Sequence, residues 1–101
     1  MSETDLVRAC LQLLAVRGIV AWRNNSGVIR RGTHVYWAGL KGSSDLIGLL
    51  RDGRFLAVEC KRPGNRLTPE QRVFQRSITE SGGVAWTVYS AEQLEGLIKN
   101  A

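Results

Sequence analysis

Residues 42–61 read GSSDLIGLLRDGRFLAVECK, and they predict the centre of the fold. Two apolar runs of strand length flank the dipeptide Asp52-Gly53, which is a strong short-range signal for a β-hairpin. Side chains alternate across a strand, so Glu59 and Lys61 share one face of the second run, while Cys60 belongs to the other. The sequence therefore predicts a hairpin from which a carboxylate and an ammonium project together.

A second carboxylate, Asp45, opens the first strand of this hairpin. Asp45 and Glu59 can converge on a divalent cation, and Mg²⁺ prefers oxygen ligands of this kind. The backbone carbonyl of Cys60 is a candidate third ligand. Lys61 is a candidate for positioning the attacking water or for stabilising the transition state. Two carboxylates beside a lysine are the groups that metal-assisted phosphodiester hydrolysis needs.

The same residues also have an ordinary structural interpretation. Glu59 and Lys61 can form a surface ion pair on a strand, with Asp45 as a turn residue. An isolated Glu-x-Lys pattern favours that interpretation, because the pattern is short and common. The aspartate at the start of the preceding strand shifts the balance toward a site.

Three short motifs resemble the signature of a known nuclease family. They are GSSD at residues 42–45, ECKRPG at residues 59–64 and LTPEQ at residues 67–71. Together they are similar to the VRR-NUC family of the PD-(D/E)xK nuclease superfamily, and in particular to its small stand-alone, phage-type members. The resemblance begins at about Arg23 and ends at Tyr89, which is most of the chain. The residue before the aspartate is a serine where the superfamily nominally has proline, and that position has no catalytic role in the chemistry above.

The resemblance implies a restriction-endonuclease-like α/β sandwich with a central mixed sheet flanked by helices. It implies metal-dependent cleavage of nucleic acid, with Asp45 and Glu59 as ligands of Mg²⁺ or Mn²⁺ and Lys61 as the base or stabiliser. It also implies an endonuclease specific for branched DNA, such as Holliday junctions or flaps. A homodimer would suit paired incisions in a symmetric junction. Roles in DNA repair, recombination or phage DNA processing rest on the resemblance alone.

Two further side chains have both a structural and a functional interpretation. Glu3 follows Ser2, which can cap a helix, so Glu3 can complement the helix dipole; the resemblance instead suggests an acidic residue near the metal, and both interpretations stay open. Gln71 can complete a capping box with Thr68. The resemblance places a glutamine near the catalytic site at this point, and the two roles of Gln71 do not exclude each other.

The N-terminal part of the chain predicts a helix, a strand and one ambiguous segment. Apolar residues recur at helical spacing after Ser2 until Gly18, and residues 19–23 then read as a strand. Residues 28–37 are compatible with a hairpin or an ordered loop. Gly39 and Gly42 allow the backbone near Asp45 to approach a ligand closely.

The C-terminal part predicts two helices around one strand. Thr68 and Pro69 begin a helix that ends at Gly82, residues 84–89 read as a buried strand, and Ser90 caps a last helix. The buried stripe of the first of these helices is expected to consist of Val73, Phe74 and Ile78. The order of elements favours an α/β sandwich in which this helix is the crossover between two parallel strands.

The chain has 101 residues, which suits one domain spanning residues 1–101. Its formal net charge is +5 and its pI is about 9.9, which suits a polyanionic partner, although a basic protein without such a partner has the same charge. Basic residues bracket the proposed site in sequence. The candidate nucleic-acid contacts are Arg23, Arg30, Arg31, Lys41, Arg62 and Arg66.

Composition also bears on the compartment of the protein. Cys10 and Cys60 fall within apolar patterns and are expected to be buried thiols rather than a disulfide or a metal site. No apolar stretch approaches the roughly 20 residues of a membrane span, and acidic residues precede the first apolar residues, unlike a signal peptide. We expect the protein in the cytoplasm of a bacterium or of a phage-infected host cell.

Two other functions compete with the nuclease. A catalytically inactive nucleic-acid-binding module would need the positive surface but not Asp45, Glu59 and Lys61, which are costly to bury without a metal. A protein-interaction domain would show no salt-dependent affinity for DNA. Tyr36 and Trp37 are compatible with base stacking or with a core or interface position.

Overall fold

The turn at Asp52-Gly53 joins two antiparallel strands, as the sequence predicts. These strands are β4 (Leu46–Leu49) and β5 (Phe55–Cys60). Across the turn, the Leu50 amide donates a hydrogen bond to the Arg54 carbonyl at 2.9 Å. The hairpin forms the middle of the main sheet.

The computed structural model describes the backbone of residues 1–101 and the side chains of all of them except residues 37 and 38. The other elements are α1 (Glu3–Val16), β1 (Val20–Arg23), β2 (Gly27–Arg31), β3 (His34–Ala38), α2 (Pro69–Glu80), β6 (Val84–Val88) and α3 (Ala91–Lys99). The main sheet is mixed and has the order β1-β4-β5-β6, with β5 and β6 parallel. β2 and β3 form a separate antiparallel ribbon.

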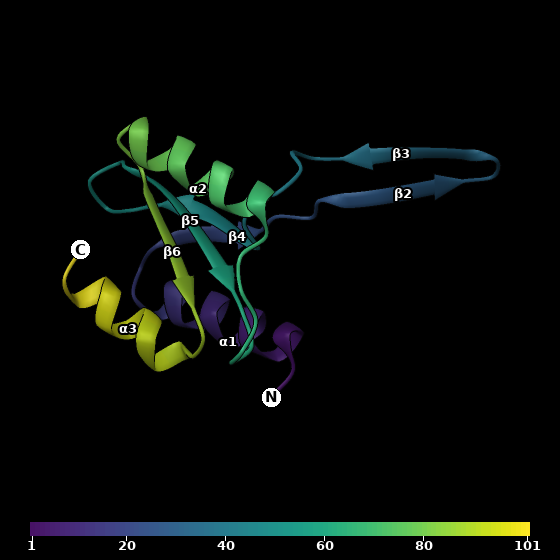
Figure 1. Cartoon of the computed structure of the whole chain (residues 1–101). Helices are drawn as coiled ribbons and strands as arrows, with labels where there is room; N and C mark the ends of the chain where they lie inside the picture. The colour runs from purple at the N-terminus through teal and green to yellow at the C-terminus, as the bar shows by residue number, and fades with distance from the viewer.

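Helices cover both faces of the four-stranded sheet (Figure 1). α1 and α3 lie on one face, where Cys10 and Leu94 share a buried cluster with Val58 of β5. α2 lies on the other face, where Phe74 packs in a second cluster with Ala57. This arrangement is the α/β sandwich with a mixed sheet that the order of elements predicts. No helix in the described part of the chain is long and apolar enough to cross a membrane.

α2 is the predicted crossover between the parallel strands β5 and β6. Thr68 caps it: the Thr68 hydroxyl accepts a hydrogen bond from the Gln71 amide, and the Gln71 side chain accepts one from the Thr68 amide. Phe74 and Ile78 face the sheet as expected, but Val73 is 62% exposed, so the prediction of a buried Val73 was wrong. Val73 is turned by about 100° from Phe74 around the helix, which directs it to solvent.

β6 was predicted as a strand buried in the sheet, and its position differs. The strand is present, but it is an edge strand, because the sheet ends after β6. Residues 84–87 are half-buried, and Val88 is fully buried. The apolar sequence of β6 reflects the helices that cover its two faces rather than a second neighbouring strand.

Two glycines allow the backbone to approach other backbone closely. A Cβ atom on Gly48 of β4 would lie 2.3 Å from the carbonyl oxygen of Val20 in β1. A Cβ atom on Gly42 would lie 2.5 Å from the carbonyl oxygen of Glu70 in α2. Gly42 was expected to make room for a ligand, but the structure gives it a packing role against α2. Gly39 similarly lies close to Ser26, a residue of a neighbouring loop.

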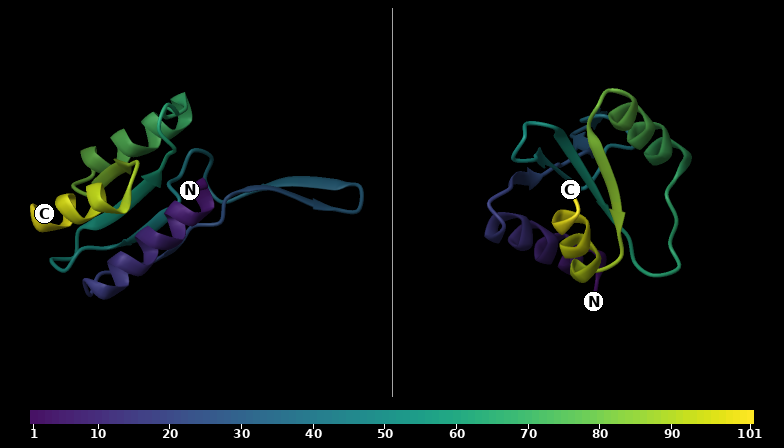
Figure 2. Two further views of the ribbon diagram at one scale, coloured as in Figure 1. Left: turned by 90° about the horizontal axis from the view of Figure 1, so that it is seen from below. Right: turned by 90° about the vertical axis from the view of Figure 1, so that its left-hand side faces the viewer.

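β2 and β3 form an arm that projects beyond the sandwich (Figure 2). Residues 28–37, which the sequence left between a hairpin and a loop, are a hairpin with Ile29 opposite Tyr36. Gly32 makes its turn with a positive φ of 59°. Tyr36 is half-exposed, so it is not a core residue, and the side chain of Trp37 lies outside the described residues.

Candidate active site

The register of the central hairpin brings two of the predicted ligands together. Leu46 lies opposite Val58 in the antiparallel ladder, so Asp45 lies opposite Glu59 on the same face of the sheet. The Asp45 carboxylate also accepts a hydrogen bond from the Cys60 amide at 2.8 Å. This bond fixes the Asp45 side chain against the end of β5.

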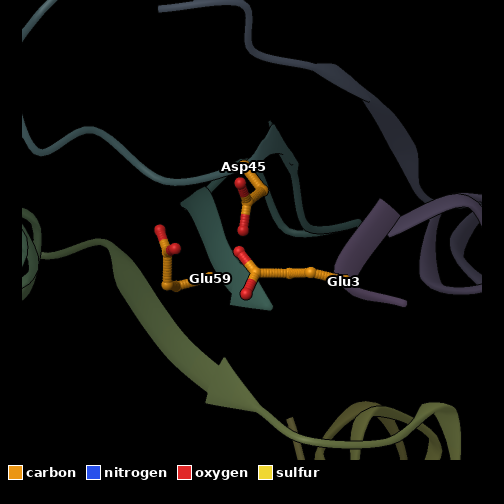
Figure 3. Close-up of side chains that lie close together, drawn as sticks. All are labelled: Glu3, Asp45 and Glu59. Atoms are coloured by element: carbon orange, nitrogen blue, oxygen red, sulfur yellow. The ribbon is translucent and has the colours of Figure 1, made fainter. Parts of the chain in front are cut away.

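The first helix adds a third carboxylate to this pair (Figure 3). Glu3 lies in the first turn of α1, which Ser2 caps, and its side chain points to Asp45 and Glu59. One carboxylate oxygen from each of the three residues lies within 4.8 Å of the other two. Of the two interpretations of Glu3, the structure therefore supports a place at the cluster, while Glu3 still occupies the helix N-terminus.

Glu59 is the most buried member of this carboxylate cluster. It is 3% exposed, and its Oε1 atom has no hydrogen-bond partner among the described residues. Burial, together with the nearby Asp45 carboxylate, raises the pKa of Glu59 to about 8, and the Lys61 ammonium only partly opposes that shift. Without a further positive charge, the ionised cluster is therefore electrostatically unfavourable.

Lys61 lies beside Glu59 in a buried position. Its Nζ atom is 3.8 Å from Glu59 Oε2, and the residue is 8% exposed. The Glu59–Lys61 pair is thus not the solvated surface ion pair of the ordinary interpretation. A buried ammonium held next to carboxylates is suited to contact a phosphate oxygen or a water molecule at the cluster.

Gln71 has both of the predicted contacts. Its Oε1 atom accepts the hydrogen bond from the Thr68 amide at 2.9 Å, and its Nε2 atom donates to Glu59 Oε2 at 3.2 Å. The start of α2 is therefore joined to the carboxylate cluster through a single side chain. The capping box and the proximity to the site coexist because the amide has one acceptor and one donor end.

The cluster has a donor set that fits a hard divalent cation. All three side chains offer carboxylate oxygens, which suit Mg²⁺ or Mn²⁺. The unpartnered Glu59 Oε1 and the raised pKa of Glu59 are the features of a site that a bound cation would stabilise. Glu3, Asp45 and Glu59 would hold such an ion. The Cys60 carbonyl, at the end of β5, was predicted as a third ligand beside Asp45 and Glu59, and with Glu3 it would be the fourth.

Asn24 supports the site in a way that the sequence did not reveal. Its side-chain amide donates to the Ser43 hydroxyl at 2.7 Å and to the Ser44 carbonyl at 3.0 Å. Its backbone amide donates to the Asp45 carbonyl at 2.8 Å. Asn24 therefore fixes the loop that presents Asp45. In the sequence it appeared as an ordinary turn residue, because nothing local indicates which distant loop it contacts.

The six basic residues proposed as nucleic-acid contacts are all exposed, but they are not all near the carboxylate cluster. Arg23 lies opposite Leu46 at the end of the sheet that carries Asp45. Arg62 and Arg66 are on the loop that leaves β5 at the same end. Lys41 lies on the loop before Asp45 and is 3.9 Å from Glu70. The structure separates the other two, Arg30 and Arg31, which lie on the projecting arm.

The two cysteines are buried and free, as predicted. Both belong to the cluster between α1 and the sheet. Contact with the Cys10 thiol and burial raise the pKa of the Cys60 thiol well above its usual range, so Cys60 is held as the neutral thiol. Its backbone, rather than its sulfur, faces the carboxylate cluster through Asp45.

Comparison with known proteins identifies the family. The VRR-NUC domain matches the chain over residues 6–92, which covers most of its length. A search of curated proteins finds no match to this chain. The chain belongs to the VRR-NUC family, a family of nucleases, and its mixed-sheet α/β structure is compatible with a restriction-endonuclease-like fold.

Proposed function

We propose that this VRR-NUC chain is a Mg²⁺- or Mn²⁺-dependent endonuclease that hydrolyses phosphodiester bonds in DNA. The observation that supports it most directly is the convergence of Glu3, Asp45 and Glu59 next to the buried Lys61. Three carboxylates this close together, one of them buried, repel one another unless a cation compensates for their charge. Membership of a nuclease family supports the proposal that a cation bound there would assist phosphodiester hydrolysis.

Each side chain has a distinct task in this proposal. Asp45, Glu59 and Glu3, with the Cys60 carbonyl, hold the cation, which when bound supplies acidity to water and offsets charge on the phosphate. The Lys61 ammonium donates hydrogen bonds to the attacking water or to a phosphate oxygen. Gln71 was predicted to be catalytic, and its contact with Glu59 supports a positioning role instead, because it holds the carboxylate by Oε2.

The substrate is proposed to be branched DNA, such as a four-way junction or a flap. Exposed Arg23, Lys41, Arg62 and Arg66 are proposed to contact backbone phosphates around the cut site. In the described part of the chain all three helices pack on the main sheet and none stands out as a recognition helix, which favours recognition of DNA shape over sequence. Two copies related by a two-fold axis would place two sites for paired incisions. The setting would be DNA processing in the cytoplasm of a bacterium or an infected host cell.

The decisive experiment compares the wild type with Glu59→Gln on four-way junction, flap, single-stranded and linear duplex DNA. Each substrate is incubated with Mg²⁺, with Mn²⁺ or with a chelator. We expect cleavage only with a metal, and a loss on the order of 10³-fold in Glu59→Gln, because several kcal/mol of transition-state stabilisation depend on the cation. The matched control is Glu80→Gln, which removes an exposed carboxylate at the far end of α2.

Metal binding has a readout that does not require cleavage. Mn²⁺ should raise the melting temperature of the wild type and of Glu80→Gln, and it should raise that of Glu59→Gln much less. DNA binding without cleavage under every metal condition would favour the inactive binding module. Absence of both DNA binding and cleavage would favour a protein-interaction domain.

A further inference from the structure

The β2–β3 arm is a large part of the molecule that contributes no residue to the carboxylate cluster. It projects from the sandwich as a two-stranded ribbon (Figures 1 and 2). Among the described residues, neither the helices nor the strands of the main sheet pack extensively against it. An isolated two-stranded ribbon has little stability of its own, so a ribbon of this kind needs a partner to hold it in place.

The arm is positively charged and has no acidic residue. No aspartate or glutamate occurs anywhere between Asp5 and Asp45 in the sequence. Arg30, Arg31 and His34 surround the turn at the tip of the arm, and all three are exposed. The tip therefore presents an unopposed positive field to whatever it touches.

The arm also exposes apolar side chains. Val28 and Val35 are 52% and 55% exposed, and Ile29 and Tyr36 are also open to solvent. Cross-strand register places Ile29 opposite Tyr36 and Arg30 opposite Val35. Each face of the ribbon thus combines apolar contact surface with a cation toward the tip.

The root of the arm lies at the carboxylate cluster. β1 ends at Arg23, and the next residue, Asn24, donates its amide hydrogen bond to the carbonyl of Asp45. The arm begins at Gly27, and the chain returns from it through the loop that leads to Asp45. The arm is therefore an insertion between the end of β1 and a metal ligand. A nucleic acid bound at the cluster must pass beside its root.

We propose that the arm enters a groove of duplex DNA on one side of the cut site and grips the backbone through the guanidinium groups of Arg30 and Arg31. This inference rests on the proposed function and adds to it a requirement for duplex next to the scissile phosphate. The major groove admits a two-stranded β-ribbon, and apolar side chains there contact sugars and thymine methyl groups. Five residues per strand at about 3.4 Å each give a reach of about 17 Å, or about five base pairs.

A second copy of this chain is the competing occupant of the arm, and charge disfavours it. Each copy has a formal net charge of +5, so a second copy offers the cations of the arm fewer negative groups than the phosphates of a nucleic acid do. Interface cores are also depleted of charged residues, whereas Arg30 and Arg31 follow directly on the apolar part of β2. A polyanion matches the cations of the ribbon.

The first test measures the salt dependence of DNA affinity. All proteins carry Glu59→Gln, so that the labelled duplex stays intact, and binding is followed by fluorescence anisotropy between 50 and 200 mM KCl. Removing two phosphate contacts with Arg30→Ala/Arg31→Ala should weaken binding about tenfold and lower the salt slope by about 2. The matched control is Arg51→Ala/Arg54→Ala, which removes the same charge from the β4–β5 turn, at the opposite end of the sheet from Asp45.

The second test varies the length of the duplex next to the junction. For the parent protein, affinity should fall when this duplex becomes shorter than about five base pairs, the length that the arm covers. The Arg30→Ala/Arg31→Ala protein should be insensitive to the same truncation. Circular dichroism of each variant checks that the fold is retained, which we expect because the arm is outside both buried clusters.

Two results would overturn the inference. One is an unchanged salt slope for Arg30→Ala/Arg31→Ala, or a loss equal to that of the control pair. The other is a shift from dimer to monomer in sedimentation for Val28→Ser/Val35→Ser with unchanged DNA affinity per subunit, which would make the arm an interface between copies. Both outcomes concern binding alone, so they remain distinct from a failure of wild-type cleavage, which would overturn only the proposed catalysis.

Discussion

Two antiparallel hairpins in this molecule begin from similar local chemistry and end in different environments. β4–β5 and β2–β3 are both short antiparallel ribbons in which apolar residues flank a glycine-containing turn. β4–β5 lies at the centre of the sheet with helices on both of its faces, and β5 is buried from Leu56 onward. In the described part of the chain, no helix packs extensively against β2–β3, and the side chains of residues 28–36 are exposed.

This difference shows that burial depends on which elements can cover a strand, rather than on the strand alone. The neighbours of β4–β5 are amphipathic helices, and their apolar faces exclude water from Glu59 and Lys61. Because water is excluded, the charges of Glu59 and Lys61 interact more strongly with each other and with the nearby carboxylates than they would on an exposed strand. The arm has no such cover, so its cations keep their solvation and are available to an external polyanion.

Isoleucines at comparable places test the contrast between the two hairpins. Ile47→Ala removes a nearly buried side chain from β4 and should lower the free energy of unfolding by about 3 kcal/mol. Ile29→Ala, in the arm, should change it by less than about 0.5 kcal/mol, because that side chain is more exposed and packs outside the core. Urea denaturation followed by tryptophan fluorescence or circular dichroism measures both. Equal losses would mean that the arm folds as part of the core.

The burial of Glu59 predicts a pH-dependent stability that the arm lacks. Its pKa rises from 4.5 to about 8 in the folded protein, so between these values the folded chain holds a proton that the unfolded chain has released. The free energy of unfolding contributed by this group should therefore fall as pH rises from 4.5 to 8, and level off above that. In a chelator at pH 9, Glu59→Gln should be more stable than the wild type by on the order of 2 kcal/mol.

Thermal unfolding across this pH range, with and without Mn²⁺, measures the effect. Mn²⁺ should reduce the difference between wild type and Glu59→Gln, because the cation compensates for the ionised carboxylates. Arg30→Ala/Arg31→Ala provides the comparison from the arm, and its pH dependence should match that of the wild type. A wild-type stability that increases from pH 5 to pH 8 in the chelator would contradict the buried state of Glu59.

Two variants of Gln71 test its role in helix capping and its role at the carboxylate cluster separately. Gln71→Ala removes both contacts and should cost about 1 kcal/mol of stability in addition to lowering cleavage. Gln71→Glu keeps an acceptor for the Thr68 amide, so it should retain most of the stability, yet it loses the donor to Glu59 and adds a negative charge. We expect kcat to fall in both variants and stability only in the first. Full cleavage activity in Gln71→Glu would leave Gln71 with a capping role alone.

Ser44 gives the smallest expected change, although it lies next to a metal ligand. Its hydroxyl is buried without a hydrogen-bond partner among the described residues, so it contributes no visible contact. Ser44→Ala should change the free energy of unfolding by less than about 0.5 kcal/mol and leave cleavage near that of the wild type. A loss of cleavage above about tenfold, measured on the same substrate as the wild type, would assign this hydroxyl a role at the site.

The sequence was sufficient for the parts of the fold that depend on local signals. The turn at Asp52-Gly53, the caps at Ser2 and Thr68 and the crossover helix were all predicted, because each follows from nearest-neighbour backbone chemistry. The pairing of Asp45 with Glu59 was also accessible, since a tight hairpin fixes the register of its strands. The family match over residues 6–92 agrees with the motifs that suggested it.

Other features depended on contacts between distant segments. The place of Glu3 at the cluster, the anchoring of the Asp45 loop by Asn24 and the packing of Gly42 against α2 all join residues whose local sequence gives no sign of a partner. The exposure of Val73, the edge position of β6 and the projection of the arm depended on which surfaces the helices cover. Local sequence specifies backbone geometry and hydrogen bonding within a few residues. Burial, and with it the pKa of Glu59, arises only when those elements pack together and exclude water.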